Sequence, residues 1–254
     1  MCRVLIISLF ICLVPGLSKE NGPLEQFQGR IVGGEDADIE DFSYQLSLEI
    51  NGNHSCGASI IGEEWALTAA HCVEGVKANQ LTIRAGTSVK GKGGTLHKIS
   101  ELVRHPKYHY ITTDNDIAVL KVSPPFEFNE KVQPVRLRKK EPKAGTRGVV
   151  TGWGAKVSGG PLQSQLQFVT VPIVDREECN KNYGEYGGIT RNMICAFGEG
   201  QDACKGDSGS PLVIKGELAG IVSWGMGCNV REHPGVYSNI ATLREFITSN
   251  TGIK

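Results

Sequence analysis

The chain has 254 residues, of which 40% are hydrophobic, enough to form one large or two small globular domains with a buried core. Its 27 basic and 27 acidic residues balance. The overall charge therefore gives no indication that nucleic acid or an anionic membrane captures the chain as a whole, and partners must be recognised at local sites.

The first residues are typical of a secretory signal. Arg3 precedes an apolar run from Val4 to Val14, and small residues follow at 16–18. A membrane anchor is the alternative, but it needs about 20 apolar residues, and the run here is too short. We expect residues 1–18 to be a signal peptide and the protein to be secreted to the extracellular space.

The cysteines support this compartment. Cys2 and Cys12 would leave with the signal, and six would remain. An even number in an oxidising compartment predicts disulfides, and six cysteines allow 15 pairings. A zinc site is disfavoured because no Cys-x-x-Cys pair exists. The six are Cys56, Cys72, Cys179, Cys195, Cys204 and Cys228.

Short apolar runs separated by turn residues fill the rest of the chain, which predicts an all-β protein. Periodicity alone leaves a barrel and a sandwich open. Only residues 242–248 have a helical, amphipathic pattern. The expected strands are residues 44–50, 59–61, 65–68, 80–85, 116–121, 148–152, 165–172, 211–214, 218–224 and 235–237.

A glycine-rich stretch at 202–211, DACKGDSGSP, has the features of an active site. Glycines on both sides of Ser208 let the backbone approach a bound substrate closely. The amides of Gly206 and Ser208 could point at one oxygen, and the carboxylates of Asp202 and Asp207 stand within six positions of the hydroxyl.

Three further motifs occur earlier, and with this stretch they carry a resemblance. They are RIVGG at 30–34, AAHC at 69–72 and DNDIAVL at 114–120. The chain from Ile31 onward resembles the trypsin family of chymotrypsin-fold serine proteases. The resemblance implies a protease domain at 31–254, built from two six-stranded antiparallel β-barrels with a short C-terminal helix. It also implies three disulfides: Cys56–Cys72, Cys179–Cys195 and Cys204–Cys228.

Serine-based hydrolysis needs a nucleophile, a general base, a group that orients the base, and donors for the oxyanion. The resemblance assigns these roles to Ser208, His71, Asp116 and the amides of Gly206 and Ser208. Each residue alone is better explained as an ordinary loop residue, but together, in the order His, Asp, Ser, they indicate catalysis. Asp114 is a second carboxylate nearby, and the apolar run after Asp116 favours Asp116 as the buried one.

Two alternative functions fit the sequence less well. An α/β-hydrolase has a Gly-x-Ser-x-Gly elbow and the triad order Ser, Asp, His, whereas Ser210 stands in place of the last glycine here and the order is reversed. A catalytically silent homologue that binds a partner is the runner-up. Such homologues typically lose a triad residue or the activation site, and this chain keeps both.

Residues 19–30 are polar, without an apolar period, which predicts an unstructured propeptide. Cleavage after Arg30 would free the amine of Ile31, which in the family pairs with the carboxylate beside the nucleophile, here Asp207. The reading of Arg30 as an ordinary exposed residue is disfavoured by the Ile-Val-Gly-Gly that follows. We expect an inactive zymogen before cleavage.

Specificity rests on Asp202, which the resemblance places at the floor of the substrate pocket. A buried carboxylate there pairs with Arg or Lys and leaves an aromatic substrate without a matching charge. Gly225 and Gly235 match the pocket walls, and Ser223 and Trp224 match the strand that binds the substrate backbone. The expected substrates are therefore proteins and peptides with Arg or Lys.

Other expectations concern partners and departures from the family. Protein inhibitors and an activating protease are expected partners, with no nucleic acid, no membrane, no cofactor and no metal, and the protein is expected to be a monomer. Residues 84–100 contain no carboxylate where relatives carry a calcium loop. Ser210 replaces a family glycine and adds a hydroxyl near Asp207. His54 matches a position that can hold Asp207 before activation, and the remaining histidines, His97 among them, are expected at the surface.

Overall fold

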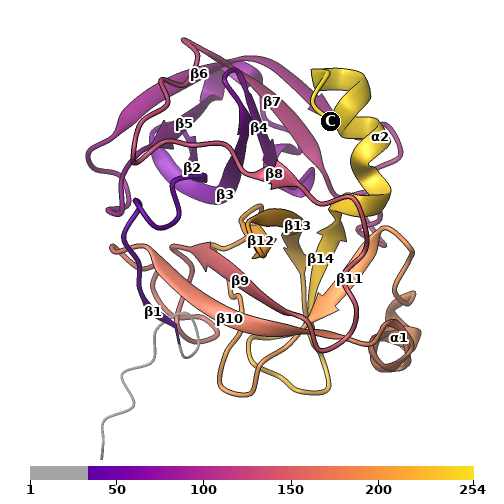
Figure 1. Ribbon diagram of the computed structural model, residues 1–254. Coiled ribbons are helices and arrows are strands. Elements are labelled where there is room, and N and C mark those ends of the chain that lie inside the picture. Colours follow the sequence, from indigo (N-terminus) through magenta and orange to yellow (C-terminus); the bar gives the residue numbers. More distant parts are fainter. Residues whose placement is uncertain (1–33) are drawn as a thin grey trace, which may run out of the picture.

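Two closed β-barrels and a C-terminal helix make up residues 34–254, the part of the chain that the computed structural model describes (Figure 1). The predicted signal peptide, the propeptide and the Arg30–Ile31 bond lie outside the described residues. The predicted fold of two six-stranded antiparallel barrels with a short C-terminal helix is confirmed.

The first barrel is closed in the order β2-β3-β4-β7-β6-β5, with antiparallel pairing throughout. In β5 the apolar side chains alternate into the core, as expected for a strand with one buried face. Its strands are β2 (Gln45–Ile50), β3 (Asn53–Gly62), β4 (Trp65–Thr68), β5 (Leu81–Ala85), β6 (Thr95–Arg104) and β7 (Ala118–Ser123).

The second barrel is closed in the order β9-β10-β11-β14-β13-β12 by the pairing of β12 with β9. Two short strands extend it: β1 (Glu35–Asp36) pairs with β10, and β8 (Arg136–Leu137) lies parallel to β13. The barrel strands are β9 (Arg147–Gly152), β10 (Gln167–Val174), β11 (Met193–Ala196), β12 (Pro211–Ile214), β13 (Glu217–Trp224) and β14 (Gly235–Asn239).

The predicted C-terminal helix is present as α2 (Ile240–Thr251). The Asn239 side chain accepts a hydrogen bond from the N–H of Ala241 and caps its start, and Gly252, with φ 74°, ends it. Its buried Leu243 and Ile247 belong to the core of the first barrel, so a helix that follows the second barrel joins the two.

Three predictions about local structure were incomplete or wrong. β6 and β11 were not predicted, and neither was helix α1 (Arg176–Tyr183), whose first amides are capped by Asp175. His97 is buried instead of exposed, because its two ring nitrogens bond Thr95 Oγ1 at 2.8 Å and the carbonyl of Pro124 at 2.7 Å. Within residues 34–254, no helix is long and apolar enough to cross a membrane.

An arginine, Arg84, holds residues 84–100, the segment in which no calcium site is expected. Arg84 bonds the buried carboxylate of Glu49 at 2.6 Å and the carbonyl of Gly93 at 2.8 Å. The guanidinium thus joins β5, β2 and the loop that leads into β6. The Arg84 side chain therefore acts as a cross-link between these segments of the first barrel.

Candidate active site

Three of the four sequence motifs, AAHC, DNDIAVL and the stretch at 202–211, contribute residues from both barrels to one place. His71 follows β4 and opens a short 3₁₀ turn, η1 (His71–Val73), while Asp116 lies just before β7. Ser208 stands in the loop before β12 of the second barrel. The N–H of Gly57 on β3 donates to the carbonyl of Ser208 at 2.7 Å, so the nucleophile loop is fixed directly to the first barrel.

Asp116 fixes the orientation of His71 through two hydrogen bonds. Its Oδ1 accepts the backbone N–H of His71 at 2.9 Å, and its Oδ2 lies 2.8 Å from His71 Nδ1. Since a carboxylate only accepts, Nδ1 carries the proton and Nε2 is left as the basic nitrogen. Asp116 is 1% exposed and His71 has a partly exposed ring, so the free nitrogen can face a substrate.

Two serines hold Asp116 from the second barrel. Ser223 Oγ donates to Oδ2 at 2.5 Å, and Ser238 Oγ donates to the backbone carbonyl of Asp116 at 2.6 Å. Ser223 and His71 thus satisfy the buried carboxylate, while Ser238 fixes the backbone that carries it. Asp114 lies elsewhere: its carboxylate accepts from Thr190 and Asn192, so the two aspartates are distinguished as predicted.

Ser208 is half-buried and lies against the same group of residues. A Cβ built on the neighbouring Gly209 would be 3.3 Å from Cys72 Sγ, and His71 Nε2 is 3.7 Å from that sulfur. Within residues 34–254 the Ser208 hydroxyl makes no hydrogen bond, and none joins it to His71. In the absence of substrate such bonds are often long and shorten in the complex.

The turn at Gly206 presents two backbone amides, its own and that of Ser208. Gly206 has φ 97°, a value that L side chains avoid, and a Cβ there would collide with Leu162. In the described part of the chain, neither the N–H of Gly206 nor that of Ser208 donates to a protein acceptor. Both amides can therefore donate to a bound oxygen.

His54 supports this turn from the first barrel. Its Nε2 is 3.3 Å from the carbonyl of Gly206 and its Nδ1 is 2.8 Å from Ser47 Oγ. Because a carbonyl only accepts, Nε2 carries the proton and Ser47 donates to Nδ1. Burial lowers the pKa of His54 to about 4, so the ring is neutral at physiological pH. In this structure His54 bonds the Gly206 carbonyl and not the carboxylate of Asp207.

Asp202 lies at a pocket of about 330 Å³ that Ser208, Ser223, Trp224, Gly225 and Gly235 also line. The carboxylate is 2% exposed. Its Oδ2 accepts the N–H of Asn229 at 2.7 Å, whereas its Oδ1 has no hydrogen-bond partner among the described residues. Burial raises the pKa of Asp202 to about 6, against the opposing effect of the backbone N–H donors.

Gly235 provides the space beside this carboxylate, since a Cβ there would be 3.1 Å from Asp202 Oδ1. The Cys204–Cys228 disulfide joins two segments of the pocket wall. A buried carboxylate with one unpaired oxygen is unfavourable unless a cation or a hydrogen-bond donor reaches it. The pocket therefore suits a long cationic side chain.

Asp207, which precedes Ser208 in the chain, is fully buried. It accepts the N–H of Gly154 at 2.8 Å and of Cys204 at 3.0 Å, and within residues 34–254 no Lys, Arg or His pairs with it. Burial raises the pKa of Asp207 to about 7. Ser210 is also fully buried, and its hydroxyl has no hydrogen-bond partner among these residues.

The structure contains the three disulfides that the resemblance implied, Cys56–Cys72, Cys179–Cys195 and Cys204–Cys228. Cys56, His71 and Cys72 are the one group of possible metal ligands that lie close together in residues 34–254. The two sulfurs are bonded to each other, so they are not the thiolates that bind zinc.

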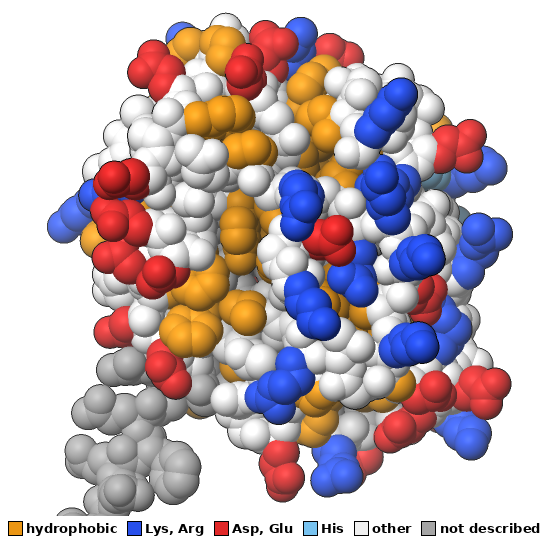
Figure 2. Space-filling view, viewed as in Figure 1, with side chains coloured by type: hydrophobic (Ala, Val, Ile, Leu, Met, Phe, Trp, Pro, Cys, Tyr) orange, Lys and Arg blue, Asp and Glu red, His pale blue; other side chains and the backbone are white. Residues whose placement is uncertain are grey.

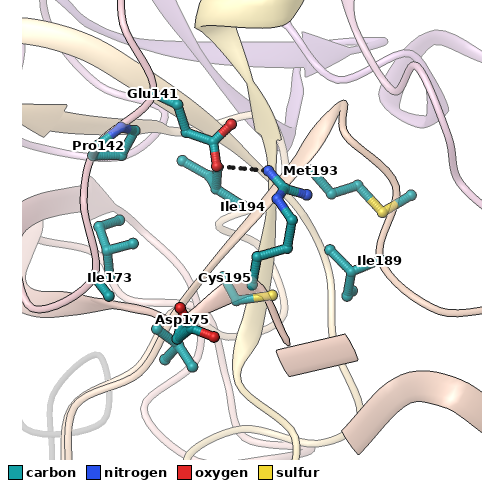
Figure 3. A pocket seen from close by; sticks show the side chains of 11 residues that line it. Glu141, Pro142, Ile173, Asp175, Ile189, Met193, Ile194 and Cys195 are labelled. Carbon is teal, nitrogen blue, oxygen red and sulfur yellow. Dashed lines mark hydrogen bonds and ion pairs between the residues drawn. The ribbon is translucent and has the colours of Figure 1, made fainter. Parts of the chain in front are cut away.

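A second pocket lies at the linker between the barrels and contains none of these candidate catalytic groups. Figure 3 shows the Glu141 carboxylate at its edge, joined to a guanidinium that belongs to Arg176, at 2.7 Å. Its other labelled side chains are mostly apolar, among them Ile173 and Ile189. The candidate active site is therefore the pocket at Asp202 and Ser208.

Two β-barrels that bring a serine, a histidine and a carboxylate to their junction define the chymotrypsin-fold serine endopeptidases. The sequence model of the Trypsin family matches residues 31–247. The chain is 42% identical to Trypsin alpha of Drosophila melanogaster, over 97% of this chain and 96% of that protein. It is 43% identical to Trypsin beta of Drosophila erecta, over 97% and 98%, and 38% identical to Trypsin alpha-4 of Lucilia cuprina, over 98% of both. The chain belongs to the trypsin family and is a serine endopeptidase.

The sequence did not point to several residues that shape the site. Asn229 anchors Asp202, Ser238 anchors Asp116, and Ser47 fixes the tautomer of His54. Ser223 was predicted for its backbone, and its side chain also holds Asp116. No local pattern marks these residues, since Ser238 and Asp116 are 122 positions apart.

Proposed function

We propose that the chain is the secreted zymogen of a protease that cleaves peptide bonds after Arg and Lys through His71, Asp116 and Ser208. The observation that carries the specificity is Asp202, a buried carboxylate whose Oδ1 has no partner in the described residues and lies beside Gly235 at the pocket. A guanidinium or ammonium supplies both the charge and the donors that this oxygen lacks.

The reaction proceeds through an acyl-enzyme. His71 Nε2 takes the proton of the Ser208 hydroxyl as Oγ attacks the carbonyl carbon of the substrate, and the carbonyl oxygen becomes an oxyanion. The amides of Gly206 and Ser208 donate to that oxyanion, each worth about 3 to 4 kcal/mol in the transition state. The protonated His71 then gives its proton to the leaving amine as the C–N bond breaks. Water then attacks the acyl carbonyl while His71 takes its proton. The bond to Ser208 Oγ breaks, His71 returns the proton to Oγ, and the carboxylic acid product is released.

Asp116 keeps His71 in the productive tautomer and stabilises its imidazolium. The contact of 2.8 Å at Nδ1 and the burial of the carboxylate support this role. The backbone of Ser223 and Trp224 pairs with the substrate chain, while Gly225 and Gly235 leave room for its long side chain.

Activation uses the buried carboxylate of Asp207. We propose that residues 1–18 are removed as a signal, that another protease cuts after Arg30 and removes residues 19–30, and that the Ile31 ammonium pairs with Asp207. The support is a fully buried carboxylate with no cationic partner among residues 34–254 and a pKa raised by that burial to about 7. A cation brought to it would favour its charged form.

The zymogen purified from secreting cells, cut after Arg30, tests the proposal with matched arginyl, lysyl and phenylalanyl substrates. We expect rapid cleavage after Arg and Lys and covalent labelling of Ser208 by a serine-directed phosphonate. The uncut chain and the Ser208→Ala variant should show neither the cleavage nor the labelling. Acetylation of the Ile31 amine should abolish activity. Best cleavage after phenylalanine would overturn the pocket assignment, and a correctly cut chain without labelling would favour the silent homologue.

A further inference from the structure

The linker between the two barrels carries an unusual density of cations. Residues 136–147 contain six basic residues and a single carboxylate, Glu141, although the whole chain has 27 charges of each sign. Figure 2 shows Lys and Arg side chains gathered on one half of the face on which β8 lies, while the other half carries acidic side chains. The zero net charge therefore hides a strong local asymmetry.

The carboxylates of the linker and of the start of β13 are already paired, while the nearby Asp175 caps α1 by accepting the N–H groups of Glu177 and Glu178. Glu141 bonds Arg176 at 2.7 Å and also accepts from Asn239 at 2.9 Å. Glu217 bonds Arg138 at 3.1 Å. These pairs leave the other cations of the linker without a carboxylate.

Six exposed cations form what we call the linker patch. In residues 34–254 none of them has a side-chain hydrogen bond or an ion pair, so their charges face solvent without a protein partner. The linker patch consists of Arg136, Lys139, Lys140, Lys143, Arg147 and Lys215.

The fold holds these side chains along one end of the second barrel. Arg136 on β8 is paired in register with Glu217 on β13, and Lys215 lies in the turn between β12 and β13. Arg147 begins β9, which pairs with β12. These strands lie side by side in the order β8, β13, β12, β9. Because neighbouring strands are about 4.8 Å apart, the cations at their ends are spread over about 14 Å.

The linker itself is anchored at several points and carries Lys139, Lys140 and Lys143 across the same end. Arg244 of α2 donates to the carbonyl of Leu137 at 2.9 Å. Farther along, the N–H of Gly145 donates to the carbonyl of Ile173 at 2.8 Å. The cations are therefore carried by a fixed backbone. Binding of an anion then costs the protein less conformational entropy than it would if the linker were a loose loop.

We propose that the linker patch binds a linear sulfated polysaccharide. A flexible polyanion can follow the arc of the linker and meet each cation in turn, and clusters of this density are typical of surfaces that bind such chains. Single-stranded nucleic acid is disfavoured because the large exposed apolar side chains of residues 34–254, Tyr110 and Tyr186 among them, lie outside the patch, so no aromatic ring is there to stack a base. A membrane is disfavoured because no large apolar side chain within residues 136–147 is exposed for insertion.

None of the six residues lines the pocket at Asp202. The polysaccharide would therefore hold the protease without occupying its substrate site. The inference is independent of the proposed specificity, since it depends on surface charge and not on catalysis.

Binding of a fluorescent heparin octasaccharide, followed by anisotropy, tests the proposal. The full chain carries Ser208→Ala so that self-cleavage cannot remove the linker. The patch variant is Lys139→Glu/Lys140→Glu/Lys143→Glu, and the matched control is Lys77→Glu/Lys92→Glu/Lys98→Glu, which changes the net charge equally at exposed positions outside the patch. Thermal midpoints of both variants verify that they are folded.

We expect salt-sensitive binding of the octasaccharide by the parent and the control. The patch variant should bind about a hundredfold more weakly, on a scale of about fivefold for each cation at an anionic surface. An equal loss in both variants, or no binding by the parent, would overturn the proposal. Tighter binding of a single-stranded oligonucleotide of equal charge, or of phosphatidylserine vesicles, would overturn the choice of partner.

Discussion

The N–H of Asn229 lies 2.7 Å from Oδ2 of Asp202 and satisfies one carboxylate oxygen, while Oδ1 has no partner in the described residues. The pocket carboxylate is thus held in position by the backbone but is not neutralised. Because burial raises its pKa to about 6, the carboxylate loses its charge as the pH falls through about 6.

This relationship predicts a pH-dependent affinity for benzamidine, whose amidinium stays charged over the whole range. With a pKa of about 6, Asp202 is about 90% ionised at pH 7 and about 10% at pH 5. As the pH falls through this value the carboxylate gains a proton and loses its charge, so the Kd should rise about tenfold for each pH unit below 6. Calorimetric titration measures it. Asp202→Asn should bind weakly at every pH, and an affinity unchanged between pH 7 and 5 would contradict the assignment.

Asp116→Asn should lower kcat and leave KM nearly unchanged. The amide can donate to His71 Nδ1 through its nitrogen, so it favours the tautomer in which Nε2 carries the proton and cannot act as base. We expect a loss of about 10⁴ in kcat, the scale known for this family of enzymes. Steady-state hydrolysis of an arginyl amide measures it.

Ser223→Ala is the matched control for that substitution. It removes one of the hydrogen bonds to Oδ2 of Asp116 and keeps the carboxylate, the tautomer of His71 and the backbone of residue 223. Its kcat should fall far less than that of Asp116→Asn. A comparable loss in the two variants would show that positioning of the carboxylate, and not the tautomer, determines the rate.

The barrels and the catalytic motifs could be predicted because their signals are local. Alternating apolar residues mark strands such as β5, and glycines mark the turn around Ser208. Helix α1 could not be predicted from an apolar pattern because only two of its residues, Cys179 and Tyr183, are buried. The N-cap Asp175, followed by Glu177 and Glu178, was the signal that could have identified it. β6 was missed because most of its side chains are exposed, so its alternation is weak.

Contacts between distant segments could not be read from the sequence. The bonds from Ser223 and Ser238 to Asp116 depend on the way the second barrel closes against the first. The run of basic residues at 136–147 is visible in the sequence, but the sequence does not report which carboxylates are already paired. Only the positions of Glu141 and Glu217 show that the remaining cations stand alone.

Ser210→Ala should stabilise the protein. Ser210 is fully buried and its hydroxyl has no partner among residues 34–254, and such a group costs about 1 to 3 kcal/mol. Alanine keeps the Cβ and removes the oxygen, so the free energy of unfolding should rise by about 1 kcal/mol. Urea unfolding measures it. Ser210→Gly, which restores the family residue, should leave turnover within a few-fold of the parent.

Ser238→Ala provides the opposite case for the same measurement. Its hydroxyl donates to the carbonyl of Asp116 at 2.6 Å, so removal leaves a buried acceptor with one partner fewer. We expect a loss of about 1 kcal/mol. If Ser210→Ala were destabilising by a similar amount, its hydroxyl would have a partner, and the buried oxygen would be part of the support for Asp207.

Arg84→Met should destabilise the first barrel strongly, and calcium should not restore it. The side chain of Glu49 is 1% exposed and that of Arg84 is 13% exposed. Removal of the guanidinium leaves an unpaired buried carboxylate, which costs about 3 to 5 kcal/mol. Arg104→Met is the matched control, because its pair with Glu74 is exposed and worth less than about 1 kcal/mol. Urea unfolding with and without calcium measures the stability of both variants.

Adding Glu49→Gln to Arg84→Met removes the unpaired charge and should recover part of the lost stability. Equal stability of the two arginine variants, or rescue of Arg84→Met by calcium, would show that the arginine does not take the place of a metal cross-link in this loop.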